Sequence, residues 1–598
     1  MASVGELCDA LLGTPRLGDG PEEHAGSCGV LLGPEPSRLV AVEVGPADER
    51  DRRTYLALRR SVFCTELGLF DDDAAADLDE HDETATVLVA RHGGAVVGGV
   101  RLFEVAPGWW QGGRLVVSPA ARTGLGIGSA LVRAACAEAE RLGALRFEAT
   151  VLPGNTRLFE RLGWGRIRSV PVAGVAHDLV RWPVGRIARL TAATKNPLGH
   201  LLQGLTPGRR GFVGDDAAPV PGSRVLASVD GILPAMVEAD PEWAGWCGVL
   251  VGANDLAAMG AAPDGLLDAL GAPTVEHAAR VLAGIRAGSQ AFGLPVLGGH
   301  TQLGVAPALS VTALGSTDRP VPGAGRAGLD VTLTADLGGS WRPGYESRQW
   351  DSSSRRTADE LAQLGSFVAR TQPVAAKDVS MAGVVGTLGM LAEAGGCGAE
   401  LEVAAVPRPV GASLGDWLTC FPGFAMLTAD DPGRVAASAG PAVSARCGRL
   451  TAEPGVRLRW PDGEVTVAVA GGVTGLGRAR GRVLADRWGR HLADSGGTRR
   501  TGPPRPASPP RAAPGTSRLP VEHAAHHHHN PRAHPEPRPA PRGFRWNTPR
   551  TTTTTREPTP SRARHLAASG GTRRTPPPRP ASPRNHAPAP PPAPLNPR

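Results

Sequence analysis

The hydrophobic and polar positions define two patterned regions, followed by a stretch with no periodicity. In the first region, apolar residues recur at helical spacing in YLALRRSVFCTELGL, which predicts a helix over 55–69. Two β-rich runs on either side of His92-Gly93-Gly94 predict a hairpin. The same reading predicts a strand at 114–117, a helix at 128–142, a strand at 146–151, a helix at 156–162 and a final strand at 164–170. The first region therefore mixes a sheet with helices.

The second region alternates short Val/Leu strands with Ala-rich helices such as 246–259 and 275–292. Its Arg/Ser-rich stretch, Ser340–Arg356, is expected to be a surface loop. The predicted organisation is an N-terminal extension (1–45), a first domain (46–184), a second domain (189–478, in halves 189–336 and 371–478) and a tail (479–598). The fold class expected is a multidomain α/β and α+β protein.

The tail is rich in Pro and Arg and contains a repeat, HLADSGGTRRTGPPRPASP and HLAASGGTRRTPPPRPASP. A sequence this poor in large apolar residues cannot offset the entropy of ordering, so disorder is expected. The net charge is +7, but the residues from Gly496 onward hold 18 Arg, no Lys and 3 Glu, which leaves about −8 for the rest. Nucleic-acid binding is therefore open only for the tail, where a solvated appendage or translated repeat DNA is the favoured explanation of the composition.

Targeting signals and cysteines indicate the cellular compartment in which the protein is expected. The start, MASVGELCDALLGTP, lacks a basic segment followed by an apolar core, so no signal peptide is predicted. No apolar run reaches the length of a membrane-spanning helix. The eight cysteines form no CxxC pair, which argues against a structural zinc site and fits buried thiols in a reducing compartment. We expect a cytoplasmic protein with no membrane partner.

The first chemical motif is a glycine-rich turn between a strand and a helix, RTGLGIGSALV from Arg122. Glycines let the backbone approach a phosphate, and the N–H groups of the following helix point at it. A tight connection without a ligand explains such a turn equally well.

The elements that follow the turn favour the phosphate reading. The segment NTRLFERLGWGRI from Asn155 resembles the end of the GNAT acetyltransferase superfamily, and RRSVFCTELGLF with DEHDETA resembles the start of GNAT subfamilies related to acyl-homoserine-lactone synthases. This resemblance covers about residues 46–182 and implies a mixed sheet with flanking helices. It also implies that acetyl-CoA binds along the strand and turn, at Leu115, Val116, Val117, Arg122, Gly124, Gly126, Ile127, Gly128, Ser129 and Asn155.

The chain departs from this family's pattern at two positions. Thr123 stands where the family usually has Arg or Gln, and Arg122 comes one residue early. Phe159 stands where a Tyr general acid is frequent, and a phenyl ring cannot protonate a leaving thiolate. Glu104, at the end of a strand, is the candidate general base for the amine, with a solvent-facing residue as the alternative reading.

The second region contains acidic residues at strand ends and helix starts. They occur in the segments GDDAA (Asp215, Asp216), SVDG (Asp230), NDLAAMGA (Asp255) and KDVSMAG (Asp378). Each alone is explained by a helix cap or a turn. Together they predict a Mg²⁺ site, because Mg²⁺ takes oxygen ligands and bridges phosphates.

These segments resemble the AIR synthase superfamily over about residues 189–478. GGHT at Gly298–Thr301 falls where the family has a glycine pair followed by an acid or a histidine, and DVSMAGVVGTLGMLAEAGGCGAELEV resembles the start of its second half. The resemblance implies a two-half α+β domain, a homodimer, and an ATP/Mg²⁺ site. Its metal ligands would be Asp215, Asp216, Asp230, Asp255 and Asp378, and its nucleotide contacts would be Lys377, Gly298, Gly299 and His300.

His300 replaces an acid found in several relatives, which leaves the number of metals and the substrate open. Lys377 fits a phosphate contact or a salt bridge equally well.

Together these features predict a cytoplasmic bifunctional enzyme. It would combine an acyl-CoA-dependent N-acetyltransferase with an ATP/Mg²⁺-dependent activity on a small nitrogen-containing amine or amide. The alternative is a first domain that senses acyl-CoA without turnover and regulates a single ATP-dependent synthase or kinase.

Overall fold

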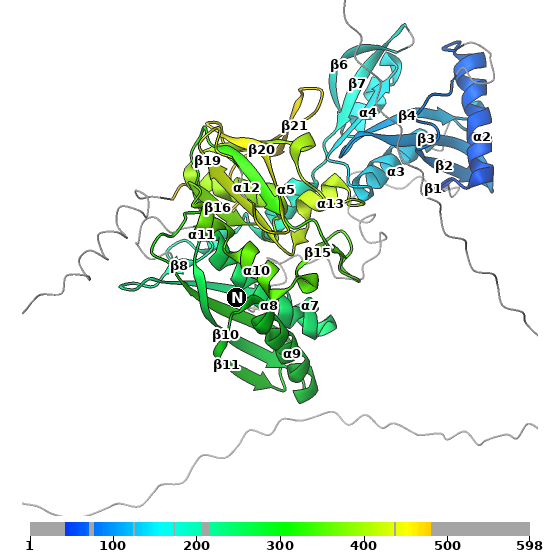
Figure 1. Cartoon of the computed structure of the whole chain (residues 1–598). Coiled ribbons are helices and arrows are strands. Elements are labelled where there is room, and N and C mark those ends of the chain that lie inside the picture. Colours follow the sequence, from blue (N-terminus) through cyan, green and yellow to red (C-terminus); the bar gives the residue numbers. More distant parts are fainter. Residues whose placement is uncertain are drawn as a thin grey trace, which may run out of the picture. The chain divides into compact units, whose positions relative to one another are not determined.

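A computed structural model describes residues 42–70, 77–122, 126–172, 174–205, 214–435 and 438–479 (Figure 1). The predicted disordered tail lies outside the described residues except for Ala479, and so does the extension before Val42. The chain divides into two units after Gly502, so all described residues belong to one unit. They form the mixed α/β architecture that the sequence predicts, with the sheets partly covered by helices.

The first sheet has seven strands in the order β1-β2-β3-β4-β5-β7-β6. Every neighbouring pair is antiparallel except β4 and β5, which are parallel. The strands are Val42–Pro46 (β1), Thr86–His92 (β2), Ala95–Ala106 (β3), Trp109–Val117 (β4), Arg146–Val151 (β5), Gly165–Val172 (β6) and Val175–Trp182 (β7). The helices are Glu49–Arg60 (α2), the π-helix Ser61–Glu66 (η3), Pro119–Ala121 (η4), Ile127–Arg141 (α3), Pro153–Asn155 (η5) and Thr156–Arg161 (α4).

Local chemistry explains where these elements begin and turn. Asp48 caps α2, because its side chain accepts the N–H of Asp51 at 2.8 Å. The predicted hairpin is confirmed, and its two turn residues, Gly93 and Gly94, both have positive φ (56° and 79°), as a type I′ turn requires.

The first region differs from the sequence prediction in four places. The strand predicted at 114–117 begins earlier, at Trp109. The helical stretch begins earlier than predicted, at Glu49, and ends in a π-helical turn. Val42–Pro46 is a strand rather than part of a patternless extension. The predicted final strand is followed by β7, which inserts between β5 and β6. Sequence periodicity could not reveal that insertion, because strand order is a long-range property.

The second region opens with two linker helices and then builds a five-stranded sheet in the order β11-β10-β12-β9-β8. Its strands are Ala218–Pro219 (β8), Val225–Ile232 (β9), Ala262–Ala272 (β10), Val296–Leu303 (β11) and Ala308–Ser316 (β12). The helices are Arg186–Thr194 (α5), Leu198–Leu201 (α6), Pro234–Ala239 (α7), Pro241–Ala258 (α8) and Val275–Phe292 (α9). The predicted helices at 246–259 and 275–292 correspond to α8 and α9.

Helices α8 and α9 pack closely through small residues. A Cβ on Gly245 would lie 2.1 Å from the carbonyl oxygen of Val281, and one on Gly284 would lie 1.9 Å from that of Glu242. One face of the sheet is buried under α8, with Val311 and Ala313 of β12 each 1% exposed. This packing fixes the position of the C-terminal part of α8, which carries Asp255.

The C-terminal half forms a seven-stranded sheet in the order β16-β19-β13-β20-β17-β21-β22. Strand β13 belongs to this sheet, so the boundary between the two sheets falls before Asp330 rather than near the predicted residue 336. The strands are Asp330–Ala335 (β13), Ala375–Asp378 (β16), Gly398–Glu402 (β17), Ala425–Asp430 (β19), Val443–Thr451 (β20), Gly455–Arg459 (β21) and Val465–Val469 (β22). The helices are Ala358–Gly365 (α10), Phe367–Thr371 (α11), Gly383–Gly395 (α12), Val403–Ala405 (η7) and Leu414–Thr419 (α13).

The Arg/Ser-rich stretch from Ser340 to Arg356 is not the surface loop that its composition predicts. It forms two strands of a small third sheet, Ser340–Trp341 (β14) and Gln349–Asp351 (β15), joined by Phe421–Pro422 (β18) and followed by the turn Ser353–Arg355 (η6). Gln349 accepts a hydrogen bond from the indole N–H of Trp243 at 2.8 Å, and both side chains are buried. Polar residues are buried here because they bond to the tryptophans of α8.

Within the described ranges, no helix is both long enough and apolar enough to cross a membrane.

Candidate functional site

Strands β4 and β5 part in the middle of the first sheet. They pair in parallel from Trp109/Arg146 to Gly112/Ala149, and beyond Gly112 the strand β4 pairs only with β3. Strand β5 meanwhile stays paired with β7. Backbone N–H and C=O groups on the facing edges of both strands therefore lack a strand partner among the described residues, which makes them available to an extended ligand.

A cavity of about 430 Å³ lies at this gap. Leu115, Asn155 and Phe159 line it, and Phe159 is buried edge-to-face against Trp164. Val116, by contrast, is 2% exposed and belongs to the core. Of the strand residues predicted to bind the cofactor, Leu115 faces the cavity.

The predicted phosphate-binding turn lies where β4 leads into α3. Gly126 has a left-handed φ of 59° and precedes α3, and no side chain among the described residues caps the first N–H groups of this helix. Gly128 and Ser129 lie in its first turn, whereas Ile127 is buried in the core. Gly124 lies outside the described residues. The helix start therefore offers uncapped donors to an anion.

The Arg122 side chain is already bonded to other residues near this turn. Its guanidinium forms a two-pronged ion pair with Glu66 and donates to the carbonyl oxygen of Val117 at 3.1 Å. Glu104, the candidate base, lies outside the cavity lining. It is exposed, and its carboxylate accepts the N–H of Gly108 at 2.7 Å in the β3–β4 turn.

An ionic network borders the cavity and was not assigned from sequence. Three arginines (Arg59, Arg101, Arg114) and three aspartates (Asp77, Asp79, Asp82) meet there. The aspartates come from the acidic segment that follows η3, and Arg101 and Arg114 come from β3 and β4. Burial opposes ionisation of Arg59, but the Asp82 carboxylate still raises the pKa of Arg59 above its usual value.

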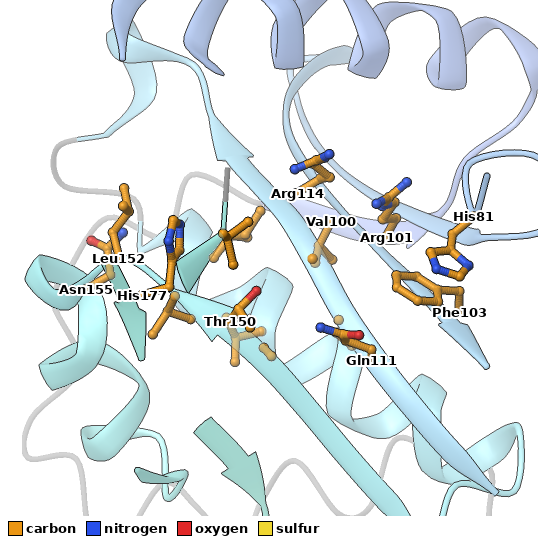
Figure 2. Close-up of a pocket in the computed structure, with 18 of the residues that line it drawn as sticks. His81, Val100, Arg101, Phe103, Gln111, Arg114, Thr150, Leu152, Asn155 and His177 are labelled. Atoms are coloured by element: carbon orange, nitrogen blue, oxygen red, sulfur yellow. The ribbon is translucent and has the colours of Figure 1, made fainter. Parts of the chain in front are cut away.

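Two histidines lie on the cavity wall and were also missed by sequence reasoning (Figure 2). His81 stacks on Phe103 with ring centroids 4.0 Å apart, whereas His177 lies beside Asn155 and Leu152. The Nδ1 of His177 is 2.9 Å from the carbonyl oxygen of Val175. A carbonyl only accepts, so Nδ1 carries the proton and Nε2 is the basic nitrogen. The strand that carries His177, β7, was absent from the sequence prediction.

In the second region, three of the predicted metal ligands converge. Oxygen atoms of Asp216, Asp255 and Asp378 all lie within 4.8 Å of one another. Asp216 precedes β8, Asp255 lies near the end of α8, and Asp378 ends β16. The site thus joins both halves of the domain, and only the folded chain assembles it.

The crowding of these carboxylates changes their acidity. Burial, together with the neighbouring Asp378 and Asp230, holds the pKa of Asp255 well above its usual range. Burial and the Asp216 carboxylate raise the pKa of Asp378 to about 8. Neighbouring carboxylates thus oppose ionisation of Asp255 and Asp378, and a bound cation would favour the ionised forms of these two groups.

The other two predicted ligands lie next to the three. Asp215 accepts the N–H of Gly323 at 2.7 Å with one oxygen, while its other oxygen is buried and unpartnered in the described chain. Burial raises the pKa of Asp215 to about 7. Asp230 likewise has a buried oxygen with no hydrogen bond in the described ranges. An all-oxygen donor set with spare buried carboxylate oxygens fits Mg²⁺.

Lys377 is the cation of this cluster. Its ammonium group contacts Asp216 and donates to the carbonyl oxygen of Gly214 at 2.7 Å. Burial alone would lower the pKa of Lys377, but Asp216 raises it above its usual value. Lys377 was expected to contact phosphate or to form a salt bridge, and the salt bridge is present in the described chain.

Gly298, Gly299 and His300 are not brought to this cluster. They lie on the edge strand β11, and β10 and β12 separate them from Asp230 on β9. Across the sheet, His300 lies in one row with Ala269, Ser310 and Gly231, and the side chains of this row face away from α8. Asp230 lies in the next row, where it pairs with the buried Val311. His300 and Asp230 therefore point to opposite faces of one sheet.

Comparison with known proteins gives matches to three family models. The Acetyltransferase (GNAT) family matches residues 55–164, and the AIR synthase related protein N-terminal and C-terminal domains match residues 214–317 and 348–471.

Two curated relatives are uncharacterized proteins. One, from Synechocystis sp., is 33% identical over 37% of this chain and 70% of its own length. The other, from Methanocaldococcus jannaschii, is 31% identical over 32% of this chain and 61% of its own length. Among solved structures, thiamine monophosphate kinase from Aquifex aeolicus is 19% identical, covers 45% of this chain and 96% of its own, and has a TM-score of 0.35.

Proposed function

Because the chain belongs to the AIR synthase-related family and also carries a GNAT domain, we propose that it is a bifunctional enzyme. One site would transfer an acyl group from acyl-CoA to a small amine, and the other would use ATP and Mg²⁺. The observation that carries the proposal is the meeting of Asp216, Asp255 and Asp378 from three distant segments. Buried like charges are costly, and a divalent cation explains why they are kept together.

In the GNAT domain, the parted strands would hold acetyl-CoA. The pantetheine would extend along Leu115–Val117, the pyrophosphate would rest on the uncapped N–H groups at Gly128 and Ser129, and Asn155 would contact the thiol end. Arg122, paired with Glu66, would assist phosphate binding only after exchanging that partner.

The transfer needs one proton to move from the amine to the leaving sulfur. The amine nitrogen bonds to the thioester carbon, the C–S bond breaks, and the electron pair stays on sulfur. We assign the proton transfer to Nε2 of His177, which lies on the same cavity wall as Asn155 and Phe159. Nε2 accepts the amine proton and then gives it to the thiolate, the step that Phe159 cannot perform. We prefer His177 to Glu104 as the general base, because the Glu104 carboxylate is hydrogen-bonded to the N–H of Gly108.

The second site would bind ATP with Mg²⁺ held by Asp216, Asp255 and Asp378, with Asp215 and Asp230 completing the set. Bound Mg²⁺ would neutralise the charge that develops on the transferred phosphoryl group. Lys377 holds Asp216 in place through their ion pair. The acceptor oxygen would belong to a carbonyl, amide or phosphate of a small nitrogen-containing metabolite.

Asp255→Asn tests the second site. Calorimetry on the full chain should show at least a tenfold loss of Mg²⁺-dependent ATP binding, because an amide cannot replace the anionic ligand. Asp318→Asn is the matched control, since Asp318 is half exposed in a surface pair with Arg224. Equal ATP affinity in Asp255→Asn and wild type would contradict the assignment.

A second candidate function for the GNAT domain is acyl-CoA sensing without turnover. Phe159 at the usual Tyr position favours it. His177→Gln separates the two: if the domain is an enzyme, release of CoA thiol should fall at least a hundredfold while acetyl-CoA binding stays unchanged. If wild type transfers no label from acetyl-CoA to any amine, the sensor is the better reading.

The assembly we propose is a homodimer through the first sheet of the AIR synthase-related domain. Its open face carries Val229, Leu267 and Leu297, which are 70%, 40% and 56% exposed. Val229 and Leu267 both pair with Thr312, so they share that face. An apolar face of this kind suits a partner copy. His300 lies on it, so a dimer would decide what His300 and the glycines before it contact.

The remaining assignments are also proposals. We take residues 46–184 and 189–478 as the two functional domains and 479–598 as an appendage. Several buried thiols, including Cys247 and Cys420, fit a reducing cytoplasm.

A further inference from the structure

Two of the three arginines beside the cavity have their charge matched by carboxylates. Arg59 binds Asp77 at 2.8 Å and Asp82 at 2.6 Å, and its side chain is completely buried. Arg101 binds Asp82 at 2.6 Å and Asp79 at 2.7 Å. Both guanidiniums are therefore held in the wall by short, charge-assisted bonds.

The third arginine, Arg114, has no such match in the described chain. Within the described residues, its one ion pair is with an Asp79 oxygen 3.3 Å away, and Arg101 already binds that oxygen. Its Nε is enclosed and has no hydrogen-bond partner among the described residues, although the side chain is 17% exposed. Arginine offers five N–H donors, so most of those on Arg114 remain for a ligand.

The pKa of the unmatched Arg114 shifts in the opposite direction to that of the paired Arg101. Burial opposes ionisation of Arg101, but the Asp79 carboxylate raises the pKa of Arg101. For Arg114, burial and then the neighbouring Arg101 and Arg59 lower the pKa. An anion bound beside Arg114 would oppose that effect.

The backbone holds Arg114 at the gap. Its φ of 53° is rare for a residue with a side chain, and its carbonyl oxygen accepts the hydroxyl of Tyr55 at 2.9 Å. The guanidinium lies over the ring of Phe70, 4.6 Å from its centroid. Arg114 follows Gly113, the residue at which β4 has left β5, so its guanidinium lines the cavity at the point where the strands separate (Figure 2).

Resting on the proposed acyl transfer, we propose that Arg114 binds the carboxylate of the acyl acceptor, and that the acceptor is an α-amino acid. The Nη groups of a guanidinium match a planar carboxylate in two parallel bonds. Asp79 is close by, so a singly charged carboxylate fits better than a phosphate dianion. In an α-amino acid one carbon separates the carboxylate from the amine, which places the nucleophile within a few ångströms of the β4–β5 gap.

The test uses the full chain and matched ligands. Alanine, phenylalanine and glutamate are compared with the amines that lack the α-carboxylate (ethylamine, phenethylamine and 4-aminobutyrate) and with O-phosphoethanolamine. Binding is measured by calorimetry in the presence of CoA, and turnover by release of CoA thiol from acetyl-CoA. The variants are Arg114→Gln, Arg114→Lys and, as the control, Arg133→Gln, because Arg133 is an exposed residue of α3.

We expect at least one amino acid to bind wild type ten or more times tighter than its decarboxylated amine. Arg114→Gln should remove that preference while acetyl-CoA binding is kept, Arg114→Lys should keep part of it, and Arg133→Gln should keep all of it. Wild type without preference for the acid, a preference unchanged in Arg114→Gln, or tighter binding of O-phosphoethanolamine would each overturn the proposal. Binding without turnover would count against acyl transfer but would leave the carboxylate site standing.

Discussion

Lys377 contacts Asp216 across the two halves of the AIR synthase-related domain, 161 positions apart in the chain. Their side chains are 4% and 7% exposed, so water could not take the place of either partner if the other were removed. The pair places an ammonium group against one carboxylate of the cluster. It also ties the segment before β8 to β16, because Lys377 donates to the carbonyl oxygen of Gly214 as well.

Lys377→Met should therefore destabilise the metal-free protein. Removing one partner of a buried pair leaves an uncompensated charge and typically costs about 3–5 kcal/mol. Arg224→Met is the control, since the exposed Arg224–Asp318 pair should be worth less than about 1 kcal/mol. Urea unfolding at pH 8 measures both. Equal losses for the two variants would contradict a structural role for the Lys377–Asp216 pair.

Metal binding should depend on pH. The folded-state pKa values of Asp378 (about 8) and Asp215 (about 7) are raised above the unfolded value of 3.8. Raised carboxyl values favour the protonated folded state, so without metal the domain loses stability as the pH rises from about 4 through 8. Mg²⁺ needs the ionised forms, so its affinity should rise from pH 6 to pH 9 with release of protons. Calorimetry in two buffers of different ionisation enthalpy measures that release, and no release at pH 7 would count against the assignment.

Tyr55 should support the position of Arg114. The hydroxyl of this fully buried residue donates to the Arg114 carbonyl at 2.9 Å, so Tyr55→Phe leaves a buried acceptor unpaired. A loss of about 1–2 kcal/mol in unfolding free energy is expected. Tyr345→Phe is the natural control, because Tyr345 is only partly buried and its hydroxyl makes no hydrogen bond within the described ranges. If Tyr345→Phe costs as much, the hydrogen bond of Tyr55 is not responsible.

Glu393 should hold the segment 473–477 in place. Its carboxylate accepts the N–H groups of Val473 and Thr474, each at 2.7 Å, and that of Gly477 at 2.9 Å. Glu393→Gln turns one oxygen into a donor that faces these donors, which should cost about 1–3 kcal/mol. Hydrogen exchange should quicken at 473–477. The exposed Glu402 gives the control Glu402→Gln, and unchanged exchange in Glu393→Gln would refute the role.

Much of the fold could be predicted from local pattern. Helices α8 and α9 and the β2–β3 hairpin follow from periodicity and from two glycines. The Ser340–Arg356 stretch could not be predicted, because its polar residues are buried by bonds to tryptophans about 100 positions away. Strand β7 was missed because the insertion of a strand between two others leaves no local signal.

The sequence by itself determined which chemical groups are present. Its motifs identified a GNAT domain and an AIR synthase-related domain, and both family matches confirm this. A glycine turn or an Asp at a strand end is a local signal, readable without the rest of the chain. Only the tertiary structure decided which groups meet. Asp216, Asp255 and Asp378 converge, while His300 points to the other face of the sheet that carries Asp230. Strand register and helix packing set those directions, and a shift of one residue would reverse them.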